Sequence, residues 1–115
     1  MSKAEQLLQQ VSNDEAWRKF DVLPESVRTT ILAPKTLDIL YAIGENNNLR
    51  QEQINKLVRY TDVILAGIVP IKLFRNTLQE ELQLDEDAAR KVATEVRDKI
   101  FMAIKDELRR IHNLM

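Results

Sequence analysis

The sequence predicts an all-α fold, an irregular bundle of five to seven helices that ends in one long C-terminal helix. Three observations predict this class. Two glycines and three prolines among 115 residues are too few for the many turns of a strand-rich protein. Helix-forming residues such as Leu, Ala, Glu, Lys, Gln and Arg dominate the composition. Apolar residues also recur at spacings of three and four, as they do along one face of a helix.

The N-terminal segment predicts two short helices. Ser2 and Glu5 have the spacing of a capping box, in which the serine side chain accepts a bond from a helical N–H, and Ser12 and Glu15 repeat it. We expect one helical domain over residues 1–115, with residues 1–21 as a peripheral or mobile helical arm.

Prolines and an asparagine run set the limits of the next two helices. Pro24 fits the first position of a third helix, and the Ala33-Pro34 pair ends it because a residue before proline resists helical dihedrals. A fourth helix is expected from about Lys35. Gly44 and residues 46–48, all asparagine, should stop it, since Asn tolerates the left-handed conformation of helix ends.

The C-terminal part predicts three further helices. A fifth should run over about residues 50–67, and Pro70 should separate it from a sixth that ends near Leu82. Asp85 is the expected N-cap of the last helix, and Arg109 and Arg110 suit its negative end. This helix of about 27 residues would be roughly 40 Å long. We expect it to be the spine of the bundle, packed against the fifth and sixth helices.

The apolar stripes predict both a core and a candidate interface. The predicted core consists of Ile43, Ile54, Leu57, Leu65, Phe74, Leu78, Val92, Val96, Ile100, Ile104 and Leu108. Around residues 63–71 and 100–102 the apolar band is wider than one stripe, so these segments are either buried on several sides or meet a partner. Burial within the monomer is the simpler interpretation. The alternative makes an interface of Val63, Ile64, Val69, Ile71, Phe101 and Met102.

A weak internal repeat accompanies these stripes. A shift of 35 residues places apolar positions of the segment 39–68 on apolar positions of the segment 74–103. Each segment reads as a short helix, a tight connection and a longer helix, and helix pairs of this length are a known repeat unit. Two amphipathic hairpins also match by chance, so a duplication remains one of two interpretations.

The pattern from Leu23 onward resembles a group of small uncharacterised helical proteins common in candidate-phyla-radiation bacteria. The matching positions are Leu23-Pro24, Ile43-Gly44, Leu65-Ala66-Gly67, Phe74, Leu78, Leu82, Leu84, Ala88-Ala89, Val96, Ile100-Phe101, Ile104, Leu108 and Ile111-His112. The resemblance implies a small bacterial helical protein, intracellular or associated with a larger assembly. It implies no activity and no catalytic residues.

Composition argues against several kinds of chemistry. Seventeen basic and 18 acidic residues nearly balance, and no cysteine is present for a disulfide or a thiolate metal site. His112 is the only histidine, and no acid lies three or four residues before it to complete a metal site. We expect it to be a surface residue at a helix C-terminus. The acidic pair Glu80-Glu81 and Glu45 should be solvated, so we expect no catalytic, cofactor-binding or metal site.

The function most consistent with the sequence is therefore a non-enzymatic module that binds another protein or a second copy of itself, as in a homodimer. The alternative is nucleic-acid binding through the last helix, with contacts from Arg90, Arg97, Arg109 and Arg110. Acidic residues are interleaved with these arginines, which makes nucleic acid the weaker partner. No small-molecule ligand and no membrane span are evident, because the longest apolar run is far shorter than about 20 residues. A cytoplasmic location is expected.

Overall fold

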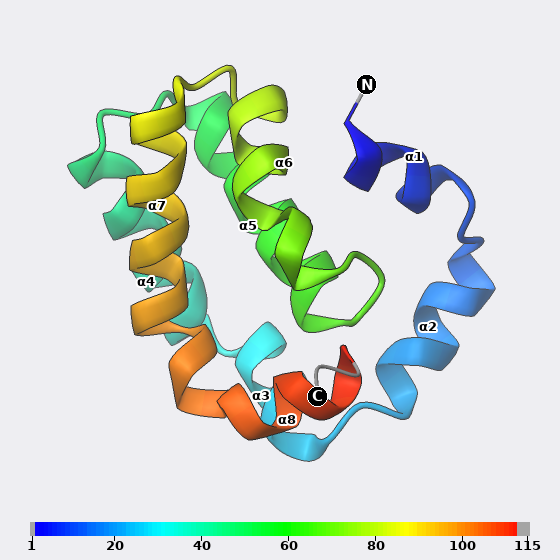
Figure 1. The fold of residues 1–115 in the computed structure, drawn as a ribbon. Helices are drawn as coiled ribbons and strands as arrows, with labels where there is room; N and C mark the ends of the chain where they lie inside the picture. The colour runs from blue at the N-terminus through cyan, green and yellow to red at the C-terminus, as the bar shows by residue number, and fades with distance from the viewer. Residues whose placement is uncertain (1, 113–115) are drawn as a thin grey trace.

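The computed structural model describes residues 2–112, and within them eight α-helices and two 3₁₀ turns follow one another without a strand (Figure 1). The helices are α1 (Lys3–Gln9), α2 (Asn13–Asp21), α3 (Glu25–Leu32), α4 (Pro34–Asn46), α5 (Gln51–Leu65), α6 (Phe74–Glu81), α7 (Glu86–Lys99) and α8 (Lys105–Ile111). The turns are η1 (Ile71–Leu73) and η2 (Phe101–Ile104). The all-helical class is confirmed, whereas the predicted number of five to seven helices is too low.

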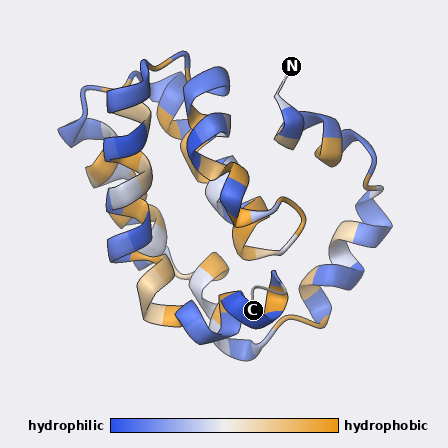
Figure 2. Cartoon of the chain, viewed as in Figure 1, coloured by the Kyte–Doolittle hydropathy of each residue, from blue (hydrophilic) through white to orange (hydrophobic). Residues whose placement is uncertain are grey.

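Two helical hairpins, α4–α5 and α6–α7, form the centre of the fold. Each pairs its two helices, and the hairpins meet through α5 against α6 and α4 against α7. The last long helix therefore packs on α6, the sixth helix, as predicted, but its second neighbour is α4 and not α5. Apolar faces turn inward and polar faces outward (Figure 2). All eleven residues of the predicted core are buried.

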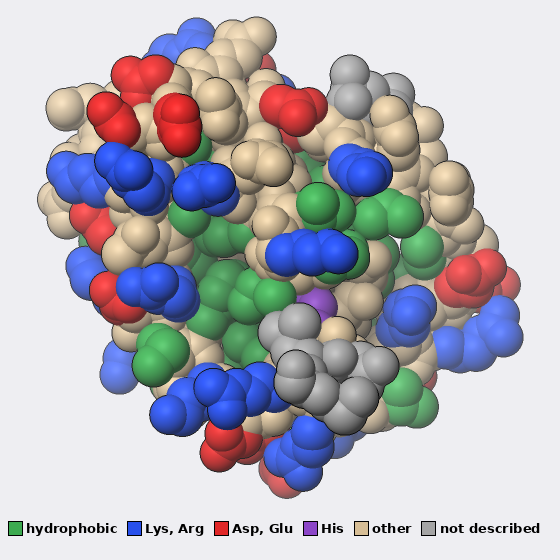
Figure 3. All heavy atoms as spheres, in the orientation of Figure 1, with side chains coloured by type: hydrophobic (Ala, Val, Ile, Leu, Met, Phe, Trp, Pro, Cys, Tyr) green, Lys and Arg blue, Asp and Glu red, His purple; other side chains and the backbone are tan. Residues whose placement is uncertain are grey.

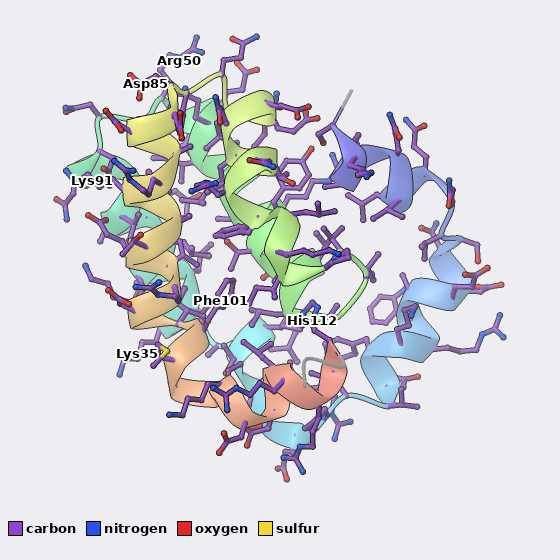
Figure 4. All side chains as sticks on the ribbon, viewed as in Figure 1. Lys35, Arg50, Asp85, Lys91, Phe101 and His112 are labelled. Carbon is purple, nitrogen blue, oxygen red and sulfur yellow. The ribbon has the colours of Figure 1, made fainter. Side chains whose placement is uncertain are left out.

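The two hairpins contain the same type of loop between their helices. Asn48 and Gln83, which lie 35 residues apart, both follow a helix end with a positive φ, 59° and 57°. The next residue of each then bonds back across the helix end, Leu49 N to Gly44 O (2.9 Å) and Leu84 N to Gln79 O (3.1 Å). These are Schellman caps, which satisfy carbonyls left over at a helix end. The N-caps that follow, Arg50 and Asp85, are again 35 residues apart, and both lie at the top of Figure 4.

Gly44 does not stop α4 as predicted; the helix continues through it to Asn46. Its role is close packing, because Gly44 is buried where α4 crosses α5. A Cβ placed on Gly44 would stand 2.8 Å from Cδ1 of Ile54 and closer still to Cγ1. The asparagine half of the prediction is confirmed, since the left-handed residue is Asn48.

We predict that Gly44→Ala lowers the free energy of unfolding by about 1–3 kcal/mol, the usual cost of overpacking a core. This result runs against helix propensity, which alone would favour Ala over Gly by about 1 kcal/mol. Urea unfolding followed by far-UV circular dichroism measures the change. In an Ile54→Ala background the added methyl should cost much less, because the opposing atoms are gone. A Gly44→Ala protein as stable as the parent would contradict the close packing.

The prediction of one continuous C-terminal helix is wrong. It breaks at Ile100, and the chain passes through η2 before α8 begins at Lys105. No glycine or proline lies there, so the local sequence does not explain the break. The turn buries both Ile100 and Phe101 and sets the Phe101 ring against Phe74, with centroids 5.5 Å apart. A straight helix of roughly 40 Å would also be longer than the molecule, whose longest dimension is 35 Å.

The break returns α8 to the body of the protein, where it meets α3 and the end of α5. His112, expected on the surface, is half-buried, and its Nε2 lies 2.7 Å from the Ile64 carbonyl oxygen. Because a carbonyl only accepts, Nε2 carries the proton. Burial lowers the pKa of His112, and the bond to Ile64 opposes that shift only in part. The ring therefore caps α5 from a distant segment as a neutral group.

We predict that His112→Ala lowers the free energy of unfolding by about 0.5–1.5 kcal/mol at neutral pH, the worth of one hydrogen bond. Because the folded-state pKa is lowered, the unfolded chain takes up the proton first, and the stabilisation is lost as the pH falls below about 6.5. The difference between parent and variant should therefore shrink on acidification. Urea unfolding across this range tests it, with the exposed Arg110→Ala as control. A difference that grows at low pH would contradict the assignment.

The N-terminal helices differ in how they attach. Within α1, Ala4 is fully buried, and Glu5 accepts bonds from Arg59 (2.8 Å) and from the Tyr60 hydroxyl (3.0 Å). Ser2 N donates to Glu81 Oε2 at 3.1 Å. Burial alone would raise the pKa of Glu81, but the bonds from Ser2 and the charge of nearby Lys56 favour the carboxylate, and that pKa is lowered.

The second helix is attached more loosely than the first. No residue of α2 is buried, and Trp17 is 67 % exposed. Of the predicted arm, α1 is therefore held to the body by side-chain contacts, and α2 lies on the surface.

Candidate functional site

A groove lies between α6 and α7 and is also lined by residues of η1. Its volume is about 420 Å³. The lining consists of Ile71, Lys72, Phe74, Arg75, Asn76, Arg90, Ala93, Thr94, Arg97 and Phe101. We call it the cationic groove, because four of these residues are basic and none is acidic. On this face, hydrophobic side chains gather in the hollow and Lys and Arg side chains stand around it (Figure 3).

Helix geometry explains how the sequence builds this groove. Arg90, Ala93 or Thr94, and Arg97 follow one another at spacings of three and four, which places them on one face of α7. Phe101 extends the line because η2 turns its ring inward (Figure 4). It meets Phe74 with ring centroids 5.5 Å apart, a tilted aromatic pair. The pair forms the apolar floor.

Ion pairs at the rim do not neutralise the groove. Arg90 pairs with Asp87 at 2.8 Å and Arg97 with Asp98 at 3.1 Å, but both pairs are exposed. Exposed pairs are worth about 0–1 kcal/mol, so either arginine can turn to another anion at little cost. Within residues 2–112 Lys72 and Arg75 form no ion pair. The groove therefore combines an apolar floor with a positive rim.

The structure separates the predicted interface residues. Ile64, Val69 and Phe101 are buried in the core of the monomer, which is the simpler of the two interpretations that the sequence offered for them. Val63 and Ile71 are half-buried, and only Met102 is well exposed, at 49 %. Residues 63–65 belong to the last turn of α5, and residues 66–70 connect that helix to η1.

The predicted nucleic-acid contacts are divided as well. Arg90 and Arg97 line the cationic groove. Arg109 and Arg110 lie exposed on α8, outside it, because the chain bends at η2. The four arginines therefore do not form one strip along one helix. Two of them instead share a site with Ile71 and Phe101 from the predicted interface, a combination that the sequence did not suggest.

Sequence reasoning missed Lys72 and Arg75, which supply half of the groove's positive charge. A signal was present, since two basic residues flank Phe74 directly after Pro70. Their partners lie on α7, however, and only the pairing of α6 with α7 brings the four cations together. The pattern within either segment is that of an ordinary solvated helix face.

A second hollow of about 350 Å³ lies between α3, α4 and α5. Its lining is Ile31, Leu32, Ala33, Pro34, Thr36, Leu37, Leu40, Val58 and Asp62. We call it the Asp62 hollow, because Asp62 is its one charged lining residue. The Asp62 carboxylate accepts no hydrogen bond and joins no ion pair within the described part of the chain. Desolvation by burial raises its pKa to about 6.

The two hollows occupy equivalent places in the two hairpins. A shift of 35 residues carries Thr36, Leu37, Leu40, Val58 and Asp62 onto Ile71, Lys72, Arg75, Ala93 and Arg97, all of which line the cationic groove. The shift places Asp62 on Arg97 and Leu37 on Lys72, so the equivalent sites differ in sign and polarity. The same hairpin geometry thus presents one basic groove and one apolar hollow with a carboxylate.

We predict that Asp62→Asn raises the free energy of unfolding at neutral pH by about 1–2 kcal/mol, a value reduced for the side chain's contact with solvent. The folded-state pKa is raised to about 6, so between about pH 4 and pH 6 Asp62 is still protonated in the native protein and already ionised in the unfolded chain. The penalty is therefore present above about pH 6 and disappears towards pH 4. Urea unfolding across this range measures the gain.

The exposed Asp38→Asn is the control for Asp62→Asn, with the same change in charge and an expected effect within about 0.5 kcal/mol. A loss of stability in Asp62→Asn at neutral pH would show that the carboxylate has a partner.

Comparison of the chain with family models, curated proteins and solved structures finds no match in any of the three. The resemblance to small bacterial helical proteins therefore stays a prediction. Among the described helices, none is both long and apolar enough to cross a membrane. Residues 2–112 also contain no cluster of three or more His, Asp or Glu side chains placed to hold a metal ion.

Proposed function

We propose that this protein is a non-enzymatic interaction module whose cationic groove binds an acidic amphipathic helix of a partner protein. The observation that carries the proposal is the ring of Lys72, Arg75, Arg90 and Arg97 around an apolar floor. A ligand that satisfies both parts must carry negative charge on an apolar body. A helix with apolar and acidic positions on neighbouring faces does so, and helix-in-groove docking is a common mode of recognition.

The spacing of the groove supports a helical ligand. Arg90 and Arg97 lie two turns apart on α7, about 10 Å along its axis. Carboxylates seven residues apart on a docked helix would have the same separation. Between them, one apolar stripe would contact Ile71 and Ala93, the half-buried apolar residues that lie over the buried rings of the floor.

Nucleic acid fits the groove less well. Proteins that hold single strands stack bases on aromatic rings, and here the floor rings of Phe74 and Phe101 are buried and packed on each other. Duplex binding needs a longer row of cations than two arginines on one helix and two basic residues on its neighbour. A cytoplasmic location and a bacterial source belong to this proposal as expectations.

We predict that the groove binds a synthetic helical peptide of about 18 residues with a leucine stripe and glutamates seven positions apart. Arg75→Glu combined with Arg97→Glu should weaken this binding at least about tenfold, because attraction becomes repulsion. The control combines Lys91→Glu with Lys99→Glu, which changes the net charge equally on the exposed side of α7 (Lys91 in Figure 4). It should change the affinity less than about twofold. Fluorescence anisotropy of the labelled peptide measures both.

Two further probes show which class of partner the groove prefers. A peptide with lysines in place of the glutamates should not bind. Tighter binding of single-stranded oligothymidylate than of the acidic peptide would favour nucleic acid and overturn the proposal. Equal losses in both double variants would do the same, since they would show a response to net charge and not to the groove.

A further inference from the structure

We propose that the Asp62 hollow is a second docking site, and that it receives an apolar segment of a partner protein carrying one Lys or Arg side chain that pairs with Asp62. The site is distinct from the cationic groove and stands if the groove proposal fails.

The rim of the hollow is an exposed apolar surface. Within residues 2–112 five large hydrophobic side chains are well exposed, and two of them, Leu32 (70 %) and Leu37 (43 %), flank this hollow. Ile31, Leu40 and Val58 continue the apolar surface inward. Exposed apolar area around a concavity is typical of interaction sites. Because the apolar surface extends past the hollow onto both rims, it suits a chain segment better than a small molecule.

The carboxylate determines the charge of the ligand. Asp62 is partly withdrawn from water, and no described residue offers it a hydrogen bond or a positive charge. In the absence of a partner this arrangement costs the monomer stability, and a cation placed in the hollow would remove that cost. An ammonium or guanidinium group on an aliphatic stem satisfies both the carboxylate and the apolar wall, as Lys and Arg side chains do.

The equivalence of the two hollows supports the same conclusion. Both hollows are lined by the two helices of one hairpin, with α3 added in the Asp62 hollow, and five lining positions correspond after the 35-residue shift. In the cationic groove the position equivalent to Asp62 is Arg97. The charge at this position is reversed in the Asp62 hollow, so the two equivalent sites favour ligands of opposite charge.

The test uses a helical peptide of about 14 residues with a leucine stripe and one central lysine, and a matched peptide with norleucine at that position. Both are titrated into the full-length, ¹⁵N-labelled protein while the amide signals of Leu32, Leu37 and Asp62 are followed. We expect the lysine peptide to bind and the norleucine peptide to bind at least about tenfold more weakly, a difference of about 1.4 kcal/mol. Hexylammonium serves as the small-molecule probe and should bind more weakly than the lysine peptide.

Matched variants assign the effect to the carboxylate. Asp62→Asn should abolish the preference for lysine over norleucine, and Asp38→Asn, an equal change of charge at an exposed position, should leave it intact. Asp62→Asn is expected to be at least as stable as the parent, so lost binding would not reflect lost folding. The proposal is overturned if neither peptide shifts these signals at about 1 mM, the weakest affinity counted as binding here. Equal binding of the two peptides, or tighter binding of hexylammonium, would also overturn it.

Discussion

The packing of Phe101 against Phe74, at the turn that follows α7, is the interaction on which the rest of the structure depends. At Ile100 the chain leaves the helix and turns through η2, and both Ile100 and Phe101 are buried there. That turn places the Phe101 ring on the floor of the cationic groove and sends α8 back across the end of α5. There His112 completes the cap of that helix. One packing requirement therefore fixes the groove, the path of the C-terminal segment and the state of the only histidine.

Local patterns in the sequence predicted the parts of this fold that depend on local physics. Ser2, Ser12 and Asp85 cap helices as their spacing indicates, because a cap involves residues only three apart. Buried positions were predictable from periodicity for the same reason. The break at Ile100 was not, since no local residue there opposes a helix and the cause is contact with distant segments. Gly44 was misread similarly: a glycine that ends a helix and one that admits a neighbouring helix look alike in sequence.

The candidate sites were harder to predict than the core. Two arginines of the cationic groove, Arg90 and Arg97, were predicted as contacts, but as part of one strip along the last helix and not of a groove between α6 and α7. A site assembled from two helices requires the pairing of those helices, which periodicity does not supply. Asp62 was overlooked altogether. It lies among apolar residues on α5, and its withdrawal from water depends on α3 and α4. The 35-residue repeat was the one long-range signal, and it relates the two sites to each other.

The loose attachment of α2 bears on how the protein can be observed. Trp17 is the only tryptophan of the chain, and it lies on a helix without a buried residue. Its intrinsic fluorescence therefore reports on α2 and responds little to unfolding of the four central helices, α4 to α7. Far-UV circular dichroism, by contrast, is dominated by α4 to α7. The two optical signals thus report on different parts of one molecule. The difference between their melting temperatures would measure how independently α2 unfolds from the central helices.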